Sequence, residues 1–367
     1  MCKNCHNEEQ AVRRLAAVPG ATNERPLKRR RAVSDPSRET YLLSPAIRFG
    51  APAKLERDPE FWFEDGSIVL IAYGDIGFRV YKRILAEHSA FFRDLFSIPQ
   101  PPKVPKIDGC PYVYVSDFPS QLRHLLRALF PTKGHLAFGK PPDGLSMDAV
   151  CSVVGLAHKY QIEQLVTQGL THLTEYYTDD FKQWCESSRS TSLEPKPIEA
   201  LRAINIAHLT GTTSILPLAF LHASRAGSRV LLGCVREDGS REGVAIEDVQ
   251  RILDGRVELI RSASTALARI FKPEVSEICT DSRRCLKVLA QKASRLDTVL
   301  EKLYDEGFAT SWVHLVNLKG ESGNPPTPWG LCQDCLEMVE ERDLWERRSF
   351  WNDLPDVFRL KVDGWEA

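Results

Sequence analysis

The stretch from residue 61 to residue 130 constrains the fold of this chain most strongly, because it alternates short apolar runs with amphipathic helical patterns. Residues 68–72 read IVLIA, a run rich in β-branched side chains, and residues 78–81 read FRVY, which alternates apolar and basic positions. Gly74 and Gly77 lie between these runs, where a tight reversal needs positive φ angles. The pattern predicts a β-hairpin.

Two helices and a third strand are predicted after the hairpin. Apolar residues recur at gaps of three, four and seven over residues 83–96, which predicts one amphipathic helix. Pro99 follows and prevents its continuation, because proline has no N–H to donate. Residues 112–115 read YVYV and predict a strand, and leucines at helical spacing over residues 122–130 predict a second helix. The expected fold class is α+β.

The motifs of this stretch resemble those of the BTB/POZ domain. The residues that carry the resemblance are the segments 78–80 (FRV), 82–85 (KRIL) and 89–96 (SAFFRDLF), with the leucine stripe after residue 122. The block is most similar to the BTB proteins that are abundant in mushroom-forming fungi. The resemblance implies a small, mainly antiparallel sheet flanked by helices, in a domain that binds other proteins, commonly a second copy of itself.

The resemblance also implies where a partner docks. Many BTB domains carry an acidic residue where this chain has Ser67 and a histidine where it has Tyr81, near a pocket used for charged contacts. The aromatic residues 61–63 precede the first predicted strand, where family members often join the dimer interface; packing within one subunit is the alternative. The residues that we associate with the fold and its dimer face are Phe61, Trp62, Phe63, Ser67, Arg79, Tyr81, Phe91 and Phe92.

The chain divides into three regions by composition and pattern. Residues 1–55 are polar, basic in part and interrupted by prolines, so we expect a disordered tail. Residues 56–178 span the stretch that resembles a BTB/POZ domain, closed by a helical hairpin. Residues 179–367 are expected to be mostly α-helical, and their longest helical pattern runs over residues 246–271 with Gly255 as a candidate bend.

Composition excludes several classes of protein. The net charge is −1, which argues against a polyelectrolyte binder. No stretch approaches the roughly 20 apolar residues of a membrane span, and the first residues have no apolar core, so we predict neither a membrane segment nor a secretory signal. Ten cysteines without a signal peptide indicate reduced thiols, and we expect the nucleus or the cytoplasm as the location.

Two short motifs lie in the tail. Lys28, Arg29, Arg30 and Arg31 form a compact basic run, which is typical of a nuclear import signal; a solvated charge run without a reader is the alternative. Ser34 lies three residues after Arg31 and two before a proline, a pattern that resembles a phosphoserine docking site. Phosphorylation of Ser34 would place about two negative charges beside the basic run and could mask it.

Four cysteines in the C-terminal region form a candidate metal site. Five residues separate Cys279 from Cys285, and two separate Cys332 from Cys335. Four thiolates would hold one structural Zn²⁺ in a closed tetrahedral shell that ties two helices together. Packing of free cysteines in the core is the alternative, because cysteine is often buried and a five-residue spacing is less usual in zinc sites.

The sequence lacks the familiar catalytic motifs, including the phosphate loop, the dinucleotide-binding fingerprint and the nucleophile elbow, so we expect no enzyme. Three functions remain: a homodimeric scaffold for other proteins, a substrate adaptor of a cullin-based ubiquitin ligase, and a transcription regulator that binds DNA through its C-terminal region. The hydrophobic-x-glutamate motif of many adaptors has no clear match, and the basic pairs 283–284 and 347–348 lie among acidic residues. We therefore expect this chain to bind other proteins, with a cullin as one candidate partner, and we do not expect it to bind nucleic acid.

Overall fold

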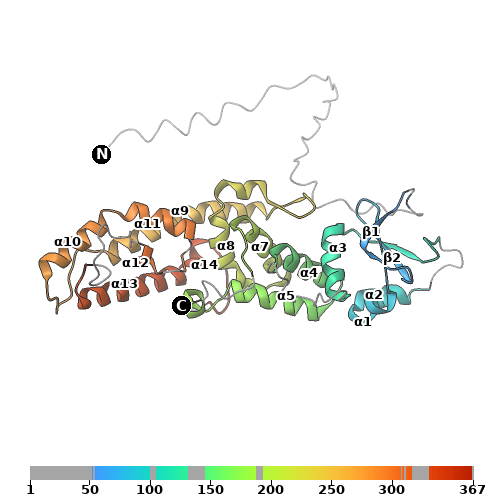
Figure 1. Cartoon of the computed structure of the whole chain (residues 1–367), viewed down its shortest axis with the longest axis horizontal. Coiled ribbons are helices and arrows are strands. Elements are labelled where there is room, and N and C mark those ends of the chain that lie inside the picture. The colour runs from blue at the N-terminus through green and yellow to red at the C-terminus, as the bar shows by residue number, and fades with distance from the viewer. Residues whose placement is uncertain are drawn as a thin grey trace, which may run out of the picture. The chain divides into compact units, whose positions relative to one another are not determined.

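The computed structural model shows a mixed α+β chain (Figure 1). It describes residues 52, 54–99, 105–130, 145–186, 193–306, 308–309, 311–315 and 330–365. The basic run at residues 28–31, Ser34 and most of the tail predicted over residues 1–55 lie outside the described residues.

The predicted hairpin is present as β2 (Ile68–Ala72) and β3 (Ile76–Val80), which pair antiparallel. Gly74 and Asp75 form the reversal with φ angles of 78° and 60°. Two consecutive positive φ angles are the mark of the hairpin turn whose twist matches that of the strands. The prediction that Gly77 supplies a positive φ was wrong, because Gly77 lies within β3.

Two further strands complete the sheet, in the order β1-β3-β2-β4. β4 (Tyr112–Tyr114) was predicted and pairs parallel with β2. β1 (Glu56–Trp62) was not predicted, and it pairs parallel with β3 at one edge. The prediction of a mainly antiparallel sheet was therefore wrong, because only the β2–β3 hairpin pairs antiparallel and both outer strands add in parallel. The sequence of β1 carries Pro59 and four charged residues, which hide a strand pattern. The strand is irregular between Arg57 and Trp62, where its register with β3 shifts.

The single helix predicted over residues 83–96 is two helices, α1 (Lys82–His88) and α2 (Ala90–Ser97). Ser89 between them has an extended backbone, with φ of −122° and ψ of 119°. Its hydroxyl accepts the N–H of Phe92 at 3.0 Å and donates to the carbonyl of Tyr160 at 2.6 Å. The Ser89 hydroxyl thus caps α2 and also anchors the chain to a distant segment. Its hydrogen-bonding capacity is therefore satisfied although the helix is interrupted at this residue.

Three helices cover the sheet and close this part of the chain: α3 (Pro119–Leu129), α4 (Met147–Lys159) and α5 (Glu163–Tyr176). Leucines of α3 and residues of α4 share a core with the inner face of the sheet. The buried carboxylate of Asp117 accepts hydrogen bonds from the Tyr160 hydroxyl and the Lys159 ammonium, so the segment before α3 is tied to the end of α4.

The remaining described segments are mostly helical (Figure 1). Their buried apolar side chains form one hydrophobic core with those of α4 and α5. The helices are α6 (Phe181–Glu186), α7 (Ala200–Thr210), α8 (Leu216–Ser224), α9 (Ile246–Ile270), α10 (Ser282–Ala293), α11 (Leu296–Glu306), α12 (Trp312–Leu315), α13 (Gln333–Asn352) and α14 (Leu354–Val357). Three 3₁₀ helices lie at Pro197–Glu199, Thr213–Ile215 and Gly227–Leu232. β5 (Cys234–Val235) and β6 (Arg241–Glu242) form a small antiparallel hairpin. Within the described residues, no helix combines the length and apolar character that a membrane crossing requires.

The longest predicted helical pattern is confirmed as α9, and Gly255 lies inside that uninterrupted helix. The lack of a side chain at Gly255 makes room for the ring of Phe358, which follows α14 and is fully buried. A Cβ atom at Gly255 would lie 2.4 Å from two ring carbons of Phe358. The close approach of this ring therefore explains why residue 255 is a glycine.

We expect Gly255→Ala to lower the free energy of unfolding by about 1–3 kcal/mol, because the new methyl group overpacks the ring of Phe358. Gly155→Ala in α4 is the matched control, since its Cβ would meet only a carbon of Ile206 at an ordinary 3.6 Å. Alanine there should stabilise the helix by about 0.5–1 kcal/mol. Urea unfolding measures both changes, and equal shifts in the same direction would contradict the packing explanation.

Candidate functional site

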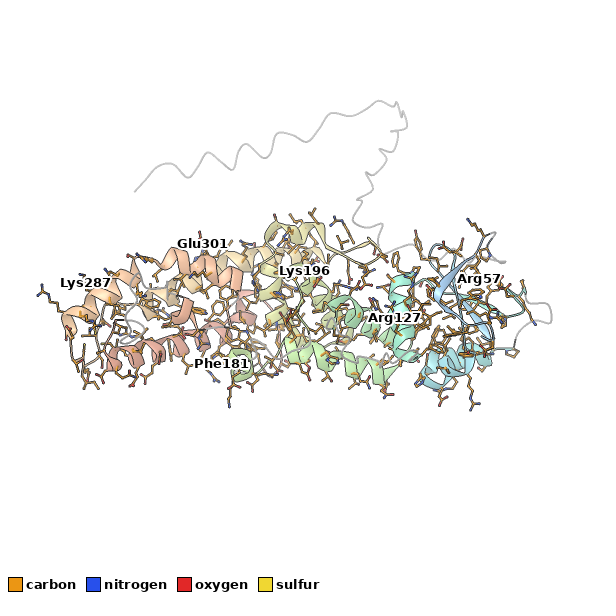
Figure 2. All side chains as sticks on the ribbon, in the orientation of Figure 1. Arg57, Arg127, Phe181, Lys196, Lys287 and Glu301 are labelled. Carbon is orange, nitrogen blue, oxygen red and sulfur yellow. The ribbon has the colours of Figure 1, made fainter. Side chains whose placement is uncertain are left out.

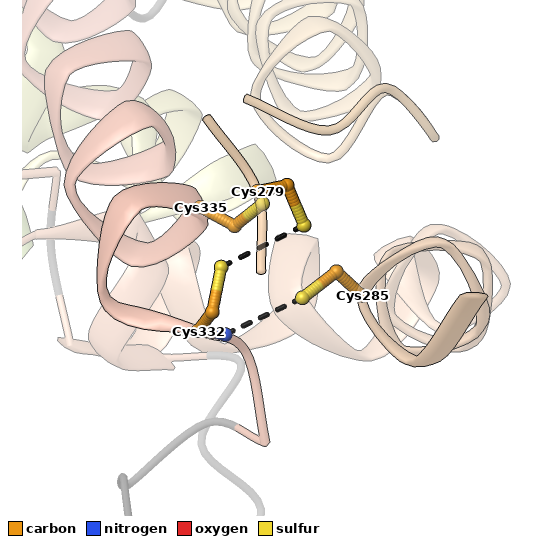
Figure 3. Close-up of side chains that lie close together, drawn as sticks. All are labelled: Cys279, Cys285, Cys332 and Cys335. Atoms are coloured by element: carbon orange, nitrogen blue, oxygen red, sulfur yellow. Dashed lines mark hydrogen bonds between the residues drawn. The ribbon is translucent and has the colours of Figure 1, made fainter. Parts of the chain in front are cut away.

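The structure brings the four predicted cysteines together (Figure 3). Cys279 lies in the loop between α9 and α10, and Cys285 lies in the first turns of α10. Cys332 is the N-cap residue of α13, and Cys335 lies in its first turn. All four sulfur atoms lie within 4.8 Å of one another, and the Cys279 and Cys332 sulfurs are 3.7 Å apart.

Local backbone chemistry explains why the two cysteine pairs are presented in this way. Asp281 caps α10, where its carboxylate accepts the N–H of Arg284 at 3.1 Å, and this fixes the helix start between Cys279 and Cys285. Gly330 has a φ of 72° and reverses the chain before α13. Both pairs therefore lie at helix N-termini, where the helix dipole favours negative charge.

Backbone N–H groups point at the sulfurs. The N–H of Cys332 lies 3.3 Å from the Cys285 sulfur, and the N–H of Ser276 lies 3.4 Å from the Cys335 sulfur. Burial opposes ionisation of Cys332, but donation from the N–H groups of Cys335 and Thr280 lowers its pKa to about 6. Burial raises the pKa of Cys335 to about 12.

The donor set and its spacing fit a tetrahedral metal. Zn–S bonds of about 2.3 Å place adjacent thiolates about 3.8 Å apart, close to the measured separation of Cys279 and Cys332. None of the described cysteines forms a disulfide. Cys285 and Cys335 are fully buried, whereas Cys279 and Cys332 are half-buried. The four sulfur atoms therefore lie close enough together to bind one metal ion.

A second cluster of potential ligands has no counterpart in the sequence analysis. His124 of α3, Asp148 of α4 and Glu237 of the β5–β6 turn have ligand atoms within 4.8 Å of one another. His124 is buried, and burial lowers its pKa although the carboxylates of Glu237 and Asp148 oppose this. The three residues are far apart in sequence, so no spacing motif indicates them.

A buried guanidinium organises the surroundings of this second cluster. Arg202 of α7 is 2% exposed, and it donates to Asp148, to Ser152 at 3.2 Å and to Glu242 of β6 at 2.9 Å. Burial alone would raise the pKa of Glu242, but the charges of Arg202 and Arg236 lower it.

The eight residues associated with the fold and dimer face occupy different environments. Phe61 and Phe92 are fully buried in the core beneath the sheet. Phe63 stacks on Tyr81 with ring centroids 5.2 Å apart, and the Tyr81 hydroxyl donates to Asp65 at 2.7 Å. These four aromatic residues therefore make their described contacts within one subunit.

Trp62 lies on the opposite face of the sheet beneath the guanidinium of Arg57, which is 4.8 Å from the ring centroid. Arg57 is labelled in Figure 2. Ser67 accepts the N–H of Lys82 at 2.9 Å, so its hydroxyl positions the start of α1. Arg79 donates to the carbonyl of Gly66 at 3.1 Å.

Phe91 is the one residue of these eight with a large exposed apolar surface, at 40%. It belongs to a pair of helices that bury little, since α1 buries only Leu85 and α2 buries only Phe92. We call this surface the α1–α2 face. Phe91 and Ile98 are its exposed apolar residues, and Ile84, Leu95 and Phe96 beside them are partly buried against the core beneath the sheet.

Comparisons of the chain with models of protein families, with curated proteins and with solved structures found no match. We therefore base the function on the residues and contacts of this chain.

We expect Glu242→Gln to lower the free energy of unfolding by about 3–5 kcal/mol at neutral pH, because it leaves the buried Arg202 with too few anionic partners. The pKa of Glu242 is lower in the folded state than its ordinary value of 4.5. The stability that its ionised carboxylate contributes is therefore fully present above pH 4.5 and is lost as the pH falls through the folded-state pKa. The deficit of the variant should therefore shrink on acidification.

Urea unfolding of both proteins between neutral and acidic pH measures this difference. Glu258→Gln is the control, because that carboxylate is 44% exposed and pairs with Arg261 one turn along the same helix. The control should change stability by no more than about 1 kcal/mol. A Glu242→Gln deficit that stays constant with pH would contradict the assigned ion pair.

Proposed function

We propose that residues 56–178 form a BTB/POZ-like interaction module, through which the chain homodimerises and scaffolds other proteins. The order of elements supports this proposal: the hairpin β2–β3 is followed by α1 and α2, then by β4 beside β2, then by α3 and the helical hairpin α4–α5. This is the order of elements that the resemblance implies.

The α1–α2 face is the observation that carries the proposal. Helices normally bury an apolar stripe, but each of these helices buries one residue fully and leaves others partly exposed. Contiguous exposed apolar groups on a folded protein mark sites for docking. A second copy of the chain offers the same face, so a two-fold symmetric contact would cover both faces at once.

One observation weighs against the DNA-binding alternative. Of the basic pair 347–348, Arg347 is buried and donates to Asp343 at 3.0 Å, so it is unavailable to a DNA phosphate. Co-purification with a cullin would add the adaptor role to the same module.

We expect Phe91→Asp to weaken the homodimer at least about tenfold, which equals roughly 1.4 kcal/mol, because it places a charge at the centre of the α1–α2 face. The fold should persist, since the side chain is 40% exposed. Light scattering over a concentration series measures the mass. Val257→Asp on α9, a site 58% exposed and outside this face, should leave the dimer intact. A monomeric wild type, or equal loss in both variants, would contradict the proposal.

We further propose that Cys279, Cys285, Cys332 and Cys335 hold one structural Zn²⁺. The metal would bind the four thiolates in a closed tetrahedral shell and tie α10 to α13. The N–H groups that point at the Cys285 and Cys335 sulfurs support this assignment, because such donors stabilise metal-bound thiolates.

Purified, reduced wild type should contain about one zinc per chain by metal analysis, and a strong chelator should lower its melting temperature. Cys332→Ser should lose the metal, because a hydroxyl replaces one of four thiolates. Cys185→Ser is the matched control, since Cys185 is likewise half-buried but lies outside the cluster. Reduced wild type without stoichiometric zinc would contradict the assignment.

A further inference from the structure

We infer that His124, Asp148 and Glu237 form a second divalent-metal site, distinct from the cysteine cluster, which takes a transition metal such as Zn²⁺ through one imidazole nitrogen and two carboxylates. The site would join three elements, namely α3, α4 and the turn between β5 and β6.

The first observation is an unsatisfied nitrogen. The buried Nε2 atom of His124 meets no partner with hydrogen-bond geometry among the residues that the structure describes, although Oε2 of Glu237 is only 3.2 Å away. The two atoms are close, but the donor geometry of a hydrogen bond is not met. Buried polar atoms without partners are rare in folded proteins and call for an explanation. A cation between the nitrogen and the carboxylate would satisfy both lone pairs.

The second observation is the separation of the ligand atoms. Tetrahedral Zn²⁺ with bonds of about 2.0–2.2 Å holds adjacent nitrogen and oxygen ligands about 3.4 Å apart, close to the 3.2 Å between His124 and Glu237. All three ligand atoms lie within 4.8 Å of one another. Glu237 is 52% exposed, so its side chain can move inward and water can complete the shell.

Asp148 keeps a lone pair for a metal despite its other contacts. Its Oδ1 atom accepts hydrogen bonds from Arg202 and from Ser152. Its Oδ2 atom accepts the backbone N–H of Glu237 at 3.0 Å. A carboxylate oxygen has two lone pairs, so Oδ2 can bind a metal while it keeps that hydrogen bond.

The charge of the surroundings favours a divalent cation. Four carboxylates and two guanidinium groups make up the local network, which leaves two negative charges in excess: Asp148, Glu237, Asp238 and Glu242 against Arg202 and Arg236. Arg127 is near, but it forms a bidentate pair with Glu60 of β1. An imidazole ligand selects a transition metal over Ca²⁺ or Mg²⁺, which prefer oxygen.

Titration of the full-length, reduced chain with Zn²⁺ against a chromophoric chelator tests this inference. Wild type should bind a second, weaker equivalent after the cysteine cluster is filled. Glu237→Gln should weaken the second equivalent about 10- to 100-fold, because it removes one ligand. Asp238→Asn is the matched control: it removes the same charge from the same turn, but its carboxylate bonds Ser120 and lies outside the ligand set. Its affinity should stay within about threefold of wild type.

Two further measurements separate this site from the cysteine cluster. With Co²⁺ as the probe, the second equivalent should add no thiolate-to-metal charge-transfer band. A Cys332→Ser chain, which lacks one thiolate, should still bind metal at the second site. Saturation by the cysteine cluster alone, or equal weakening in Glu237→Gln and Asp238→Asn, would overturn the inference while leaving the zinc assignment at the cysteines intact.

Discussion

The buried charge of Arg202 is the constraint on which much of the structure depends. An ionised group that is almost fully removed from water is costly unless it is paired and hydrogen-bonded on every side. Arg202 meets this requirement with Asp148 and Ser152 of α4 and with Glu242 of β6. One guanidinium on α7 thus fixes the position of the β5–β6 hairpin against the helix that closes the sheet-bearing region.

Periodicity predicted the parts of the fold in which one physical preference dominates. The hairpin β2–β3, the strand β4 and helix α9 each follow a clear apolar pattern, and the structure confirms them. The cysteine cluster was also predictable, because paired cysteines have a recognisable spacing. For the periodic elements and for the cysteine pairs alike, the signal lies in residues that are close together in the sequence.

The features that could not be predicted depend on contacts between distant segments. The break at Ser89 depends on the carbonyl of Tyr160, which lies 71 residues further along the chain. β1 forms because β3 offers an edge, although Pro59 and the charges of β1 argue against a strand. His124 and Glu237 meet only because the β5–β6 turn packs against α3, and no spacing along the chain reports such a contact.

β1 also has a consequence for how the sheet meets other chains. An edge strand with unpaired backbone groups is a template for a foreign strand, and natural sheets protect such edges with proline and charge. β1 carries both, with Pro59 and the exposed charged residues Glu56, Arg57 and Glu60, and β4 at the other edge has only three residues. The sheet is therefore a poor surface for strand exchange or fibre growth, and the proposed association at the α1–α2 face would use side chains instead of open backbone groups.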